Sequence, residues 1–177
     1  MEHIYDMIVV GGGPGGYTAA LYAARAGLEV LVLEKLSAGG QMALTHQIDN
    51  YPGFAQGVDG FTLAQAMQQQ AERFGAQTRL AEVRALRLAQ SPKEVETDAG
   101  TFYGKTVVYA AGAAPRELGL PEERELVGRG VSYCATCDGM LYRGKPVAVV
   151  GRSPDAPEEA NFLKNLGCQV TYLAPKR

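Results

Sequence analysis

The stretch "MIVVGGGPGGYTAALYAARAG", residues 7–27, decides the fold of this 177-residue chain. Its first four residues are an apolar run typical of a short buried strand, and a glycine-rich turn follows at residues 11–16. The alanine-rich run at residues 17–26 predicts a helix that Gly27 closes. A second apolar strand, "LEVLVLE" at residues 28–34, completes the pattern. Strand, turn, helix and strand in this order predict a βαβ unit and an α/β fold.

The glycines of this stretch have the spacing of a dinucleotide-binding site. Gly11, Gly13 and Gly16 form G-x-G-x-x-G between the predicted strand and helix. Gly11 permits a tight turn and Gly13 lets the backbone approach a pyrophosphate, while Gly16 and Ala20 let the helix pack closely on the sheet. Glu34 ends the next strand, where its carboxylate can accept hydrogen bonds from ribose hydroxyls and would repel a 2′-phosphate. The pattern therefore favours FAD or NAD over NADP, and an ordinary glycine turn is the alternative.

Composition excludes several classes of partner. The formal net charge is −2 and no run of Lys and Arg makes a basic patch, so neither nucleic acid nor an anionic membrane is expected as a partner. The start, "MEHIYDMIVV", lacks the basic segment and the long apolar run of a signal peptide or a membrane span. Three cysteines without a framework spacing argue against a disulfide-stapled secreted domain. We therefore expect a globular cytoplasmic protein.

The remaining chain predicts a helix, a β-rich stretch and a second βαβ unit. Apolar residues recur at three- and four-residue steps between residues 60 and 75, which predicts an amphipathic helix whose stripe lies in the core. Its stripe consists of Phe61, Ala64, Met67, Ala71 and Phe74. The strands of the β-rich stretch are expected at 79–90, 94–104 (with a hairpin turn at 98–100) and 106–112. A linker is expected at 114–123. The second βαβ unit is expected to have strands at 146–151 and 168–173 around a helix at about 156–166.

Several motifs resemble, in order and spacing, the low-molecular-weight thioredoxin reductases. They are "GGGPGGYTAALYAARAG", "LEK" followed by "AGGQ", "IDNYPGF", "AAGAAPRELGLPEE" and, most specific of all, "GVSYCATCDGMLYRGKPVAVVG". The resemblance covers nearly the whole chain. It implies a Rossmann-like FAD-binding domain of three layers with a β-meander at residues 1–113, and the start of a second Rossmann-like domain of the pyridine-nucleotide type at 114–177. It also implies a homodimer.

The same resemblance assigns the flavin site. FAD would be held by the first glycine-rich unit and by segments that follow the strands. Gly15 stands where the family usually has alanine. The implied residues are Gly11, Gly13, Pro14, Gly15, Gly16, Glu34, Lys35, Gly39, Gly40, Gln41, Asn50, Val83, Ala110, Ala111 and Gly112.

The pair Cys134 and Cys137 can be a metal site, a structural disulfide or a working redox pair. A structural zinc site needs two further ligands, and Cys168, His3 and His46 are not spaced to supply them, so no metal is expected. A static disulfide across so small a loop would constrain the unfolded chain little, and the cytosol would tend to reduce it. If a helix begins near Cys134, the two sulfurs lie on one face within disulfide reach. The redox reading is therefore favoured.

The resemblance divides the work of this pair. It implies that Cys137 faces the flavin and accepts its electrons, and that Cys134 attacks the disulfide of a thioredoxin-like protein. Asp138 is implied as the proton donor and acceptor, because thiol–disulfide exchange needs a thiolate to attack and a leaving thiolate to be protonated. The alternative for Asp138 is a helix cap.

The second nucleotide loop departs from the family pattern. Residues 151–156 are "GRSPDA", so Arg152 and Ser153 replace glycines and Pro154 stiffens the turn. Asp155 with Glu158 resembles a capping box, which would occupy helix amides that a phosphate needs.

The family's clamp for the 2′-phosphate is also incomplete. It aligns with Ala174, Pro175 and Lys176, so that Lys176 and Arg177 are the cations left there. These departures predict that ferredoxin or another protein replaces NADPH as the electron donor. NADPH bound through an altered loop, with Arg152 on the phosphate, is the first alternative. The second is a non-catalytic FAD-binding fragment, because family members continue past the last residues of this chain.

Overall fold

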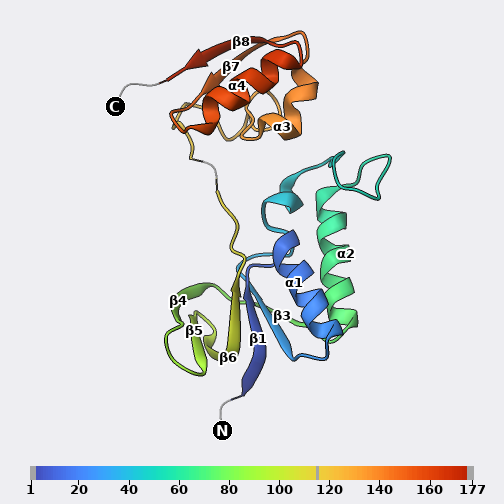
Figure 1. Ribbon diagram of the computed structural model, residues 1–177, viewed down its shortest axis with the longest axis vertical. Coiled ribbons are helices and arrows are strands. Elements are labelled where there is room, and N and C mark those ends of the chain that lie inside the picture. The colour runs from blue at the N-terminus through green and yellow to red at the C-terminus, as the bar shows by residue number, and fades with distance from the viewer. Residues whose placement is uncertain (1–2, 115, 175–177) are drawn as a thin grey trace. The chain divides into compact units, whose positions relative to one another are not determined.

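The computed structural model describes residues 3–114 and 116–174, which fall into two compact units (Figure 1). The first unit is Met1–Ala114 and the second is Pro115–Arg177. Within the described ranges, no helix is both long enough and apolar enough to cross a membrane.

The first unit is built on a six-stranded sheet with the order β3-β2-β1-β6-β5-β4. Its parallel part consists of β1 (Ile4–Val10), β2 (Val30–Glu34), β3 (Gln77–Leu80) and the second half of β6 (Gly100–Tyr109). The first half of β6 pairs antiparallel with β5 (Lys93–Thr97), which pairs antiparallel with β4 (Val83–Arg87). β6 therefore belongs both to the parallel sheet and to a meander of three strands.

This unit has three layers because the two faces of the parallel strands bury different residues. Val9, Val30 and Val32 pack in one cluster with the helix α1 (Pro14–Arg25) and with residues of α2 (Gly60–Arg73). Their neighbours along the strands pack in a second cluster with the meander, as the alternation of side chains in a strand requires (Figure 1). This second cluster contains Ile8, Val10, Leu31, Leu33, Val95, Leu86 and Phe102. The predicted α/β fold with three layers and a β-meander is confirmed.

The predicted helical stripe is only partly buried. Asp59 caps α2 by accepting the N–H of Thr62, 2.8 Å away, and the helix then buries Leu63 and Ala64. At its two ends, however, Phe61 is 50% exposed and Phe74 is 39% exposed. The expectation that both phenylalanines lie in the core is therefore wrong. The stripe runs beyond the parts of α2 that face the sheet.

The second unit contains one parallel strand pair and the cysteine segment. β7 (Pro146–Val150) pairs with β8 (Gln169–Leu173), and α4 (Asp155–Asn165) connects them, as the second βαβ pattern predicts. The cysteine segment forms the short helix α3 (Ala135–Asp138) and the 3-10 turn η2 (Gly139–Tyr142). The buried cluster of this unit consists of Val149, Ala160, Leu163 and Cys168.

Candidate functional site

The glycine-rich loop lies where the strand order of the first sheet reverses. β1 has β2 on one side and β6 on the other, and Gly11 and Ala110 directly follow β1 and β6. The N–H of Gly11 donates to the carbonyl of Leu33, and the N–H of Ala110 donates to the carbonyl of Val10, each at 2.8 Å. In open α/β sheets, ligands bind outside the carboxyl ends of the strands at such a reversal.

The glycines of this loop have different structural roles. Gly11 has φ +104°, and a Cβ there would collide with the carbonyl oxygen of Ala110. A Cβ at Gly16 would collide with the carbonyl oxygen of Gly11, so Gly16 brings α1 against the loop. Gly13 precedes the first residue of α1, and no described atom lies within 4 Å of the position that its Cβ would take. Gly11 and Gly16 are thus required by packing, whereas Gly13 borders open space.

The first turn of α1 fits the pyrophosphate of a dinucleotide. Pro14 begins the helix, no side chain caps it, and residues 14–17 include no acidic residue. The N–H groups of Gly15 and Gly16 have no acceptor one turn earlier in the helix, because the first amides of any helix lack one. These amides and the open space at Gly13 give an anion donors without a competing negative charge. FAD therefore fits the residues of this loop.

Glu34 is fixed beside the same loop. One of its carboxylate oxygens accepts the N–H of Gly12 at 2.7 Å, and the other accepts the N–H of Lys35 at 2.8 Å. The buried ring of Tyr17, which the sequence did not single out, also lies next to Gly12: a Cβ on Gly12 would be 3.1 Å from both Tyr17 and the Glu34 carboxylate. The Lys35 ammonium lies 2.7 Å from Glu82, whose carboxylate raises the pKa of Lys35. A negative carboxylate thus lies at the place where the sequence predicts contact with ribose.

Gly39 joins this loop from another segment. Its N–H donates to the carbonyl of Gly12 at 2.7 Å, and a Cβ on it would collide with Ala64 of α2. Gly40 and Gln41 follow as the first residues of the 3-10 turn η1 (Gly40–Leu44).

Other residues predicted for the flavin site lie elsewhere in the unit. Asn50 lies in the exposed segment 49–55, and Val83 begins β4 and packs against the meander-side cluster. Ala111 and Gly112 continue from Ala110 past the end of β6. The contact of these residues with a flavin stays a prediction.

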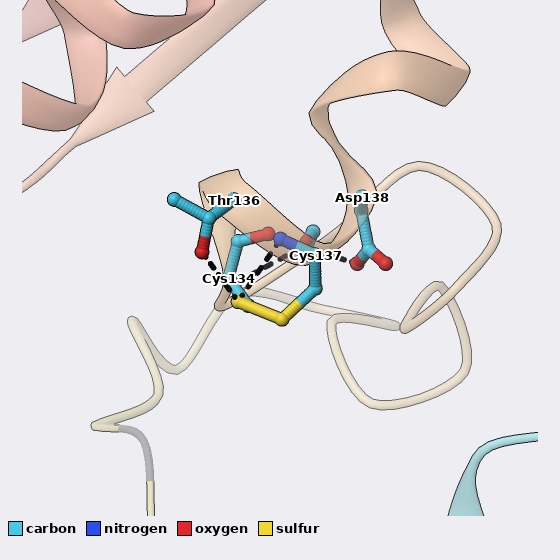
Figure 2. The surroundings of a disulfide bond; sticks show 5 residues. Cys134, Thr136, Cys137 and Asp138 are labelled. Atoms are coloured by element: carbon cyan, nitrogen blue, oxygen red, sulfur yellow. Dashed lines mark hydrogen bonds between the residues drawn. A yellow bond between two sulfur atoms is a disulfide. The ribbon is translucent and has the colours of Figure 1, made fainter. Parts of the chain in front are cut away.

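Cys134 and Cys137 are joined by a disulfide, with their Cα atoms 5.3 Å apart (Figure 2). Cys134 caps α3: its sulfur accepts the N–H of Cys137 at 3.2 Å and lies 3.4 Å from the hydroxyl oxygen of Thr136. Polar hydrogens beside a sulfur stabilise its thiolate after reduction. Cys134 is half-buried and Cys137 is exposed. The contacts thus favour Cys134 as the thiolate of the reduced pair.

The described contacts do not assemble a metal site. In residues 3–114 and 116–174, no group of three or more His, Cys, Asp or Glu side chains could hold an ion. Cys168, the third cysteine, is buried, and its thiol donates to the carbonyl of Tyr142 at 3.2 Å. That Cys134 and Cys137 form a working redox pair stays a prediction.

Asp138 interacts with a serine that the sequence reading missed. The hydroxyl of Ser132 donates to the Asp138 carboxylate at 2.5 Å, and the N–H of Cys134 donates to Ser132 Oγ at 3.1 Å. The Asp138 side chain caps neither α3 nor η2, so its alternative reading as a helix cap is wrong. The sequence signal that could have pointed to Ser132 is a hydroxyl side chain two positions before Cys134, because such side chains often bond to the nearby backbone.

The residue before Cys134 is held by a buried carboxylate. Glu123 is 5% exposed and accepts the N–H groups of Leu118 (2.9 Å), Gly119 (2.8 Å) and Leu120 (3.0 Å), and also the hydroxyl of Tyr133 at 2.7 Å. These donors, the Leu118 amide first, lower the pKa of Glu123, and the hydrogen bond to Glu123 raises the pKa of Tyr133 to about 12. The linker expected at 114–123 is therefore wrong for residues 118–123, because the Glu123 carboxylate holds them in place.

We expect Glu123→Gln to lower the midpoint of urea unfolding at pH 7, with Glu125→Gln on the nearby surface as the matched control. Because the folded state lowers the pKa of Glu123, its carboxylate stabilises the fold fully above its ordinary value of 4.5, and this contribution is lost as the pH falls. The difference between wild type and Glu123→Gln should therefore shrink below that pH. Equal midpoints at pH 7, or a difference that persists in acid, would contradict this role.

The loop that follows β7 in the second unit has the same backbone hydrogen bond as the glycine-rich loop of the first unit. The N–H of Gly151 donates to the carbonyl of Leu173 at the end of β8, as Gly11 donates to Leu33 in the first unit. The predicted capping box is wrong: α4 begins at Asp155 itself, and Pro154 precedes it without a side-chain cap. The capping box required Asp155 to stand before the helix, but Pro154 takes that place.

The start of α4 offers a phosphate few donors. Pro154 and Pro157 have no N–H group, and the N–H of Ala156 already donates to the carbonyl of Ser153 at 3.2 Å. Asp155 and Glu158 add negative charge to the first turn. Pro175, Lys176 and Arg177, where the sequence predicts a damaged 2′-phosphate clamp, lie outside the described residues.

Known proteins are similar to this chain in sequence and in fold. The family described as "Pyridine nucleotide-disulphide oxidoreductase" matches residues 5–176. A "Bifunctional thioredoxin reductase/thioredoxin" of Mycobacterium leprae is 48% identical over 97% of this chain and 38% of its own length. A "Glucosaminate ammonia-lyase" of Pseudomonas fluorescens is 44% identical over 94% of this chain and 52% of its length. The crystal structure of a thioredoxin reductase from Streptococcus pyogenes is similar with a TM-score of 0.88 and 40% identity, over 97% of this chain and 56% of that one. The chain thus spans about half the length, or less, of the proteins it matches.

Proposed function

The chain belongs to the pyridine nucleotide-disulphide oxidoreductase family, and on that premise we propose that it is the FAD-binding and disulfide-bearing part of a thioredoxin reductase-type enzyme. Its substrate is the disulfide of a thioredoxin-like protein. The observation that carries the proposal is the Cys134–Cys137 disulfide, whose first sulfur accepts an amide N–H and whose neighbour is Asp138. No contact in the described ranges gives comparable support to ammonia-lyase chemistry.

FAD supplies the electron pair that reduces this disulfide when it is bound. The loop at the start of α1 supports this cofactor, because Gly13 leaves room and Glu34 is fixed beside the loop. The same carboxylate disfavours a 2′-phosphate at this position. We place the enzyme in the cytoplasm, as its composition predicts, and as a homodimer, as the resemblance to thioredoxin reductases implies.

The residues of the second unit then pass the electrons to the substrate. Two electrons and two protons convert the Cys134–Cys137 disulfide into two thiols. The Cys134 thiolate attacks one sulfur of the substrate disulfide, so that a mixed disulfide forms and a thiolate leaves. Asp138 donates a proton to the leaving thiolate. Cys137 then attacks Cys134, which restores the internal disulfide and releases the reduced substrate.

The electron donor in this proposal is a protein such as ferredoxin, which delivers one electron at a time. Pro157 removes an amide from the first turn of α4, and Asp155 and Glu158 repel a phosphate. Ser153 also adds a Cβ at the position equivalent to Gly13 in the first loop. These features support a protein donor over NADPH.

We expect reduced ferredoxin, but not NADPH, to bleach the flavin absorbance of the FAD-loaded protein under anaerobic conditions. Dithiothreitol is the control, because it reduces the disulfide without any nucleotide site. The double variant Ser153→Gly, Pro157→Ala restores one glycine and one amide, and should respond to NADPH more than wild type does. If NADPH promptly bleaches the flavin absorbance of the wild type, NADPH and not a protein is the electron donor. Failure to retain any FAD would favour a non-catalytic fragment.

A further inference from the structure

The hydroxyl of Ser132 lies between the proposed proton donor and the backbone of the attacking cysteine. Ser132 Oγ is 2.5 Å from an Asp138 carboxylate oxygen, 3.1 Å from the nitrogen of Cys134 and 3.3 Å from the carbonyl oxygen of Cys134. A serine hydroxyl has one hydrogen to donate and two lone pairs to accept with. Since the contact with Asp138 is the shortest, the hydrogen points to the carboxylate, and the oxygen is left to accept from Cys134.

Asp138 would otherwise be weakly positioned. It ends the short helix α3 and is half-buried, beside the disulfide (Figure 2). Among the residues that the structure describes, Ser132 is the hydrogen-bond partner of its carboxylate. A free aspartate side chain rotates among several rotamers, so one strong hydrogen bond to a fixed neighbour selects the orientation.

We propose that Ser132 is a positioning residue that orients Asp138 for proton transfer to the leaving sulfur during thiol–disulfide exchange. This inference rests on the proposed function, because it concerns the same pair of cysteines. Through the N–H of Cys134, Ser132 ties the position of the acid to the position of the nucleophile.

The chemistry of one step shows what Ser132 contributes. An incoming thiolate forms a bond to one sulfur of the disulfide while the sulfur–sulfur bond breaks, and the electron pair of that bond goes to the leaving sulfur. The proton of Asp138 moves to this sulfur, so a carboxylate remains where a carboxylic acid was. The hydroxyl of Ser132 donates to that carboxylate and stabilises its new charge. No further oxidant or reductant is needed in the step.

The test measures how fast dithiothreitol reduces the Cys134–Cys137 disulfide in the full chain, by quenching with an alkylating agent and counting modified cysteines. Asp138→Asn should slow the reaction about 100-fold, because it removes a general acid. Ser132→Ala should slow it about tenfold, and Ser132→Thr, which keeps the hydroxyl, should restore most of the rate. Thr171→Ala removes an exposed hydroxyl from β8 of the same unit and is the matched control.

The double variant decides whether Ser132 acts through Asp138. In the Asp138→Asn background, Ser132→Ala should cause little further loss, because its effect passes through the acid that is already absent. Three results would each overturn the inference. The first is a further tenfold loss in the Asp138→Asn background, and the second is a Ser132→Ala rate equal to that of wild type. The third is a Ser132→Thr rate as low as that of Ser132→Ala. If Asp138→Asn slows the reaction and Ser132→Ala does not, the inference fails while the proposed function stands. If dithiothreitol does not reduce the wild-type disulfide at all, both fail.

Discussion

Replacing Cys137 by serine will produce a protein that captures its disulfide substrate and does not release it. The N–H that donates to the Cys134 sulfur belongs to the backbone of residue 137, so the substitution keeps this donor. Cys134 can then still attack, but no second thiol is present to resolve the mixed disulfide. With oxidised thioredoxin as substrate, we expect a covalent complex on a non-reducing gel and a loss of turnover of about 1,000-fold or more.

Two further cysteine variants complete this experiment. Cys134→Ser should lose turnover to the same extent and capture no substrate. Cys168→Ala should form no more covalent complex with the substrate than wild type does, because Cys168 is buried and its thiol is hydrogen-bonded to the carbonyl of Tyr142. Capture by Cys134→Ser together with no capture by Cys137→Ser would show that the roles of the two sulfurs are reversed.

Alanine at Gly13 and at Gly16 should separate cofactor binding from folding. A Cβ at Gly16 collides with the carbonyl of Gly11, so we expect Gly16→Ala to lower the free energy of unfolding by about 2–4 kcal/mol. At Gly13 the space is open, so Gly13→Ala should cost less than about 1 kcal/mol in stability. It should nevertheless weaken FAD binding at least about tenfold, because its methyl group enters the space that a pyrophosphate would occupy.

Urea unfolding of the cofactor-free chain and a fluorescence titration with FAD measure the two effects separately. Gly27→Ala, which changes a glycine of positive φ beyond the far end of α1, is a control for general damage to this helix. If Gly13→Ala binds FAD as tightly as wild type does, the pyrophosphate does not bind at this loop. An unchanged unfolding midpoint in Gly16→Ala would contradict the close packing of α1 on the loop.

Local patterns of the sequence were sufficient to predict much of the fold. The βαβ unit at the start was predictable because strand, turn and helix each depend on neighbouring residues, and the glycine spacing marks where the turn meets the helix. The structure adds that two separate close contacts require these glycines: a Cβ at Gly11 would collide with the carbonyl oxygen of Ala110, and a Cβ at Gly16 with that of Gly11. The burial of Phe61 and Phe74 was predicted wrongly, because periodicity identifies the apolar side of α2 but not where the layer beneath it ends.

The contacts around the cysteines were not predictable in the same way. Spacing alone placed Cys134 and Cys137 within reach of each other, since both lie in one helical turn. Ser132 and Asp138, however, are six residues apart and meet through a side-chain hydrogen bond, and Glu123 reaches Tyr133 across ten residues of irregular structure. Such contacts depend on the tertiary path of loops, for which the sequence has no periodic signal.

We propose that electrons reach Cys134 and Cys137 from bound FAD, and an anaerobic titration of the FAD-loaded protein in which thiols are counted tests this transfer. Dithionite would be added in steps, with flavin absorbance recorded and each sample alkylated for mass analysis. We predict that the protein takes up electrons beyond the two that FAD requires, and that alkylated Cys134 and Cys137 appear together as it does so. Full bleaching of the flavin with both cysteines still joined in their disulfide would contradict electron transfer from FAD to this pair.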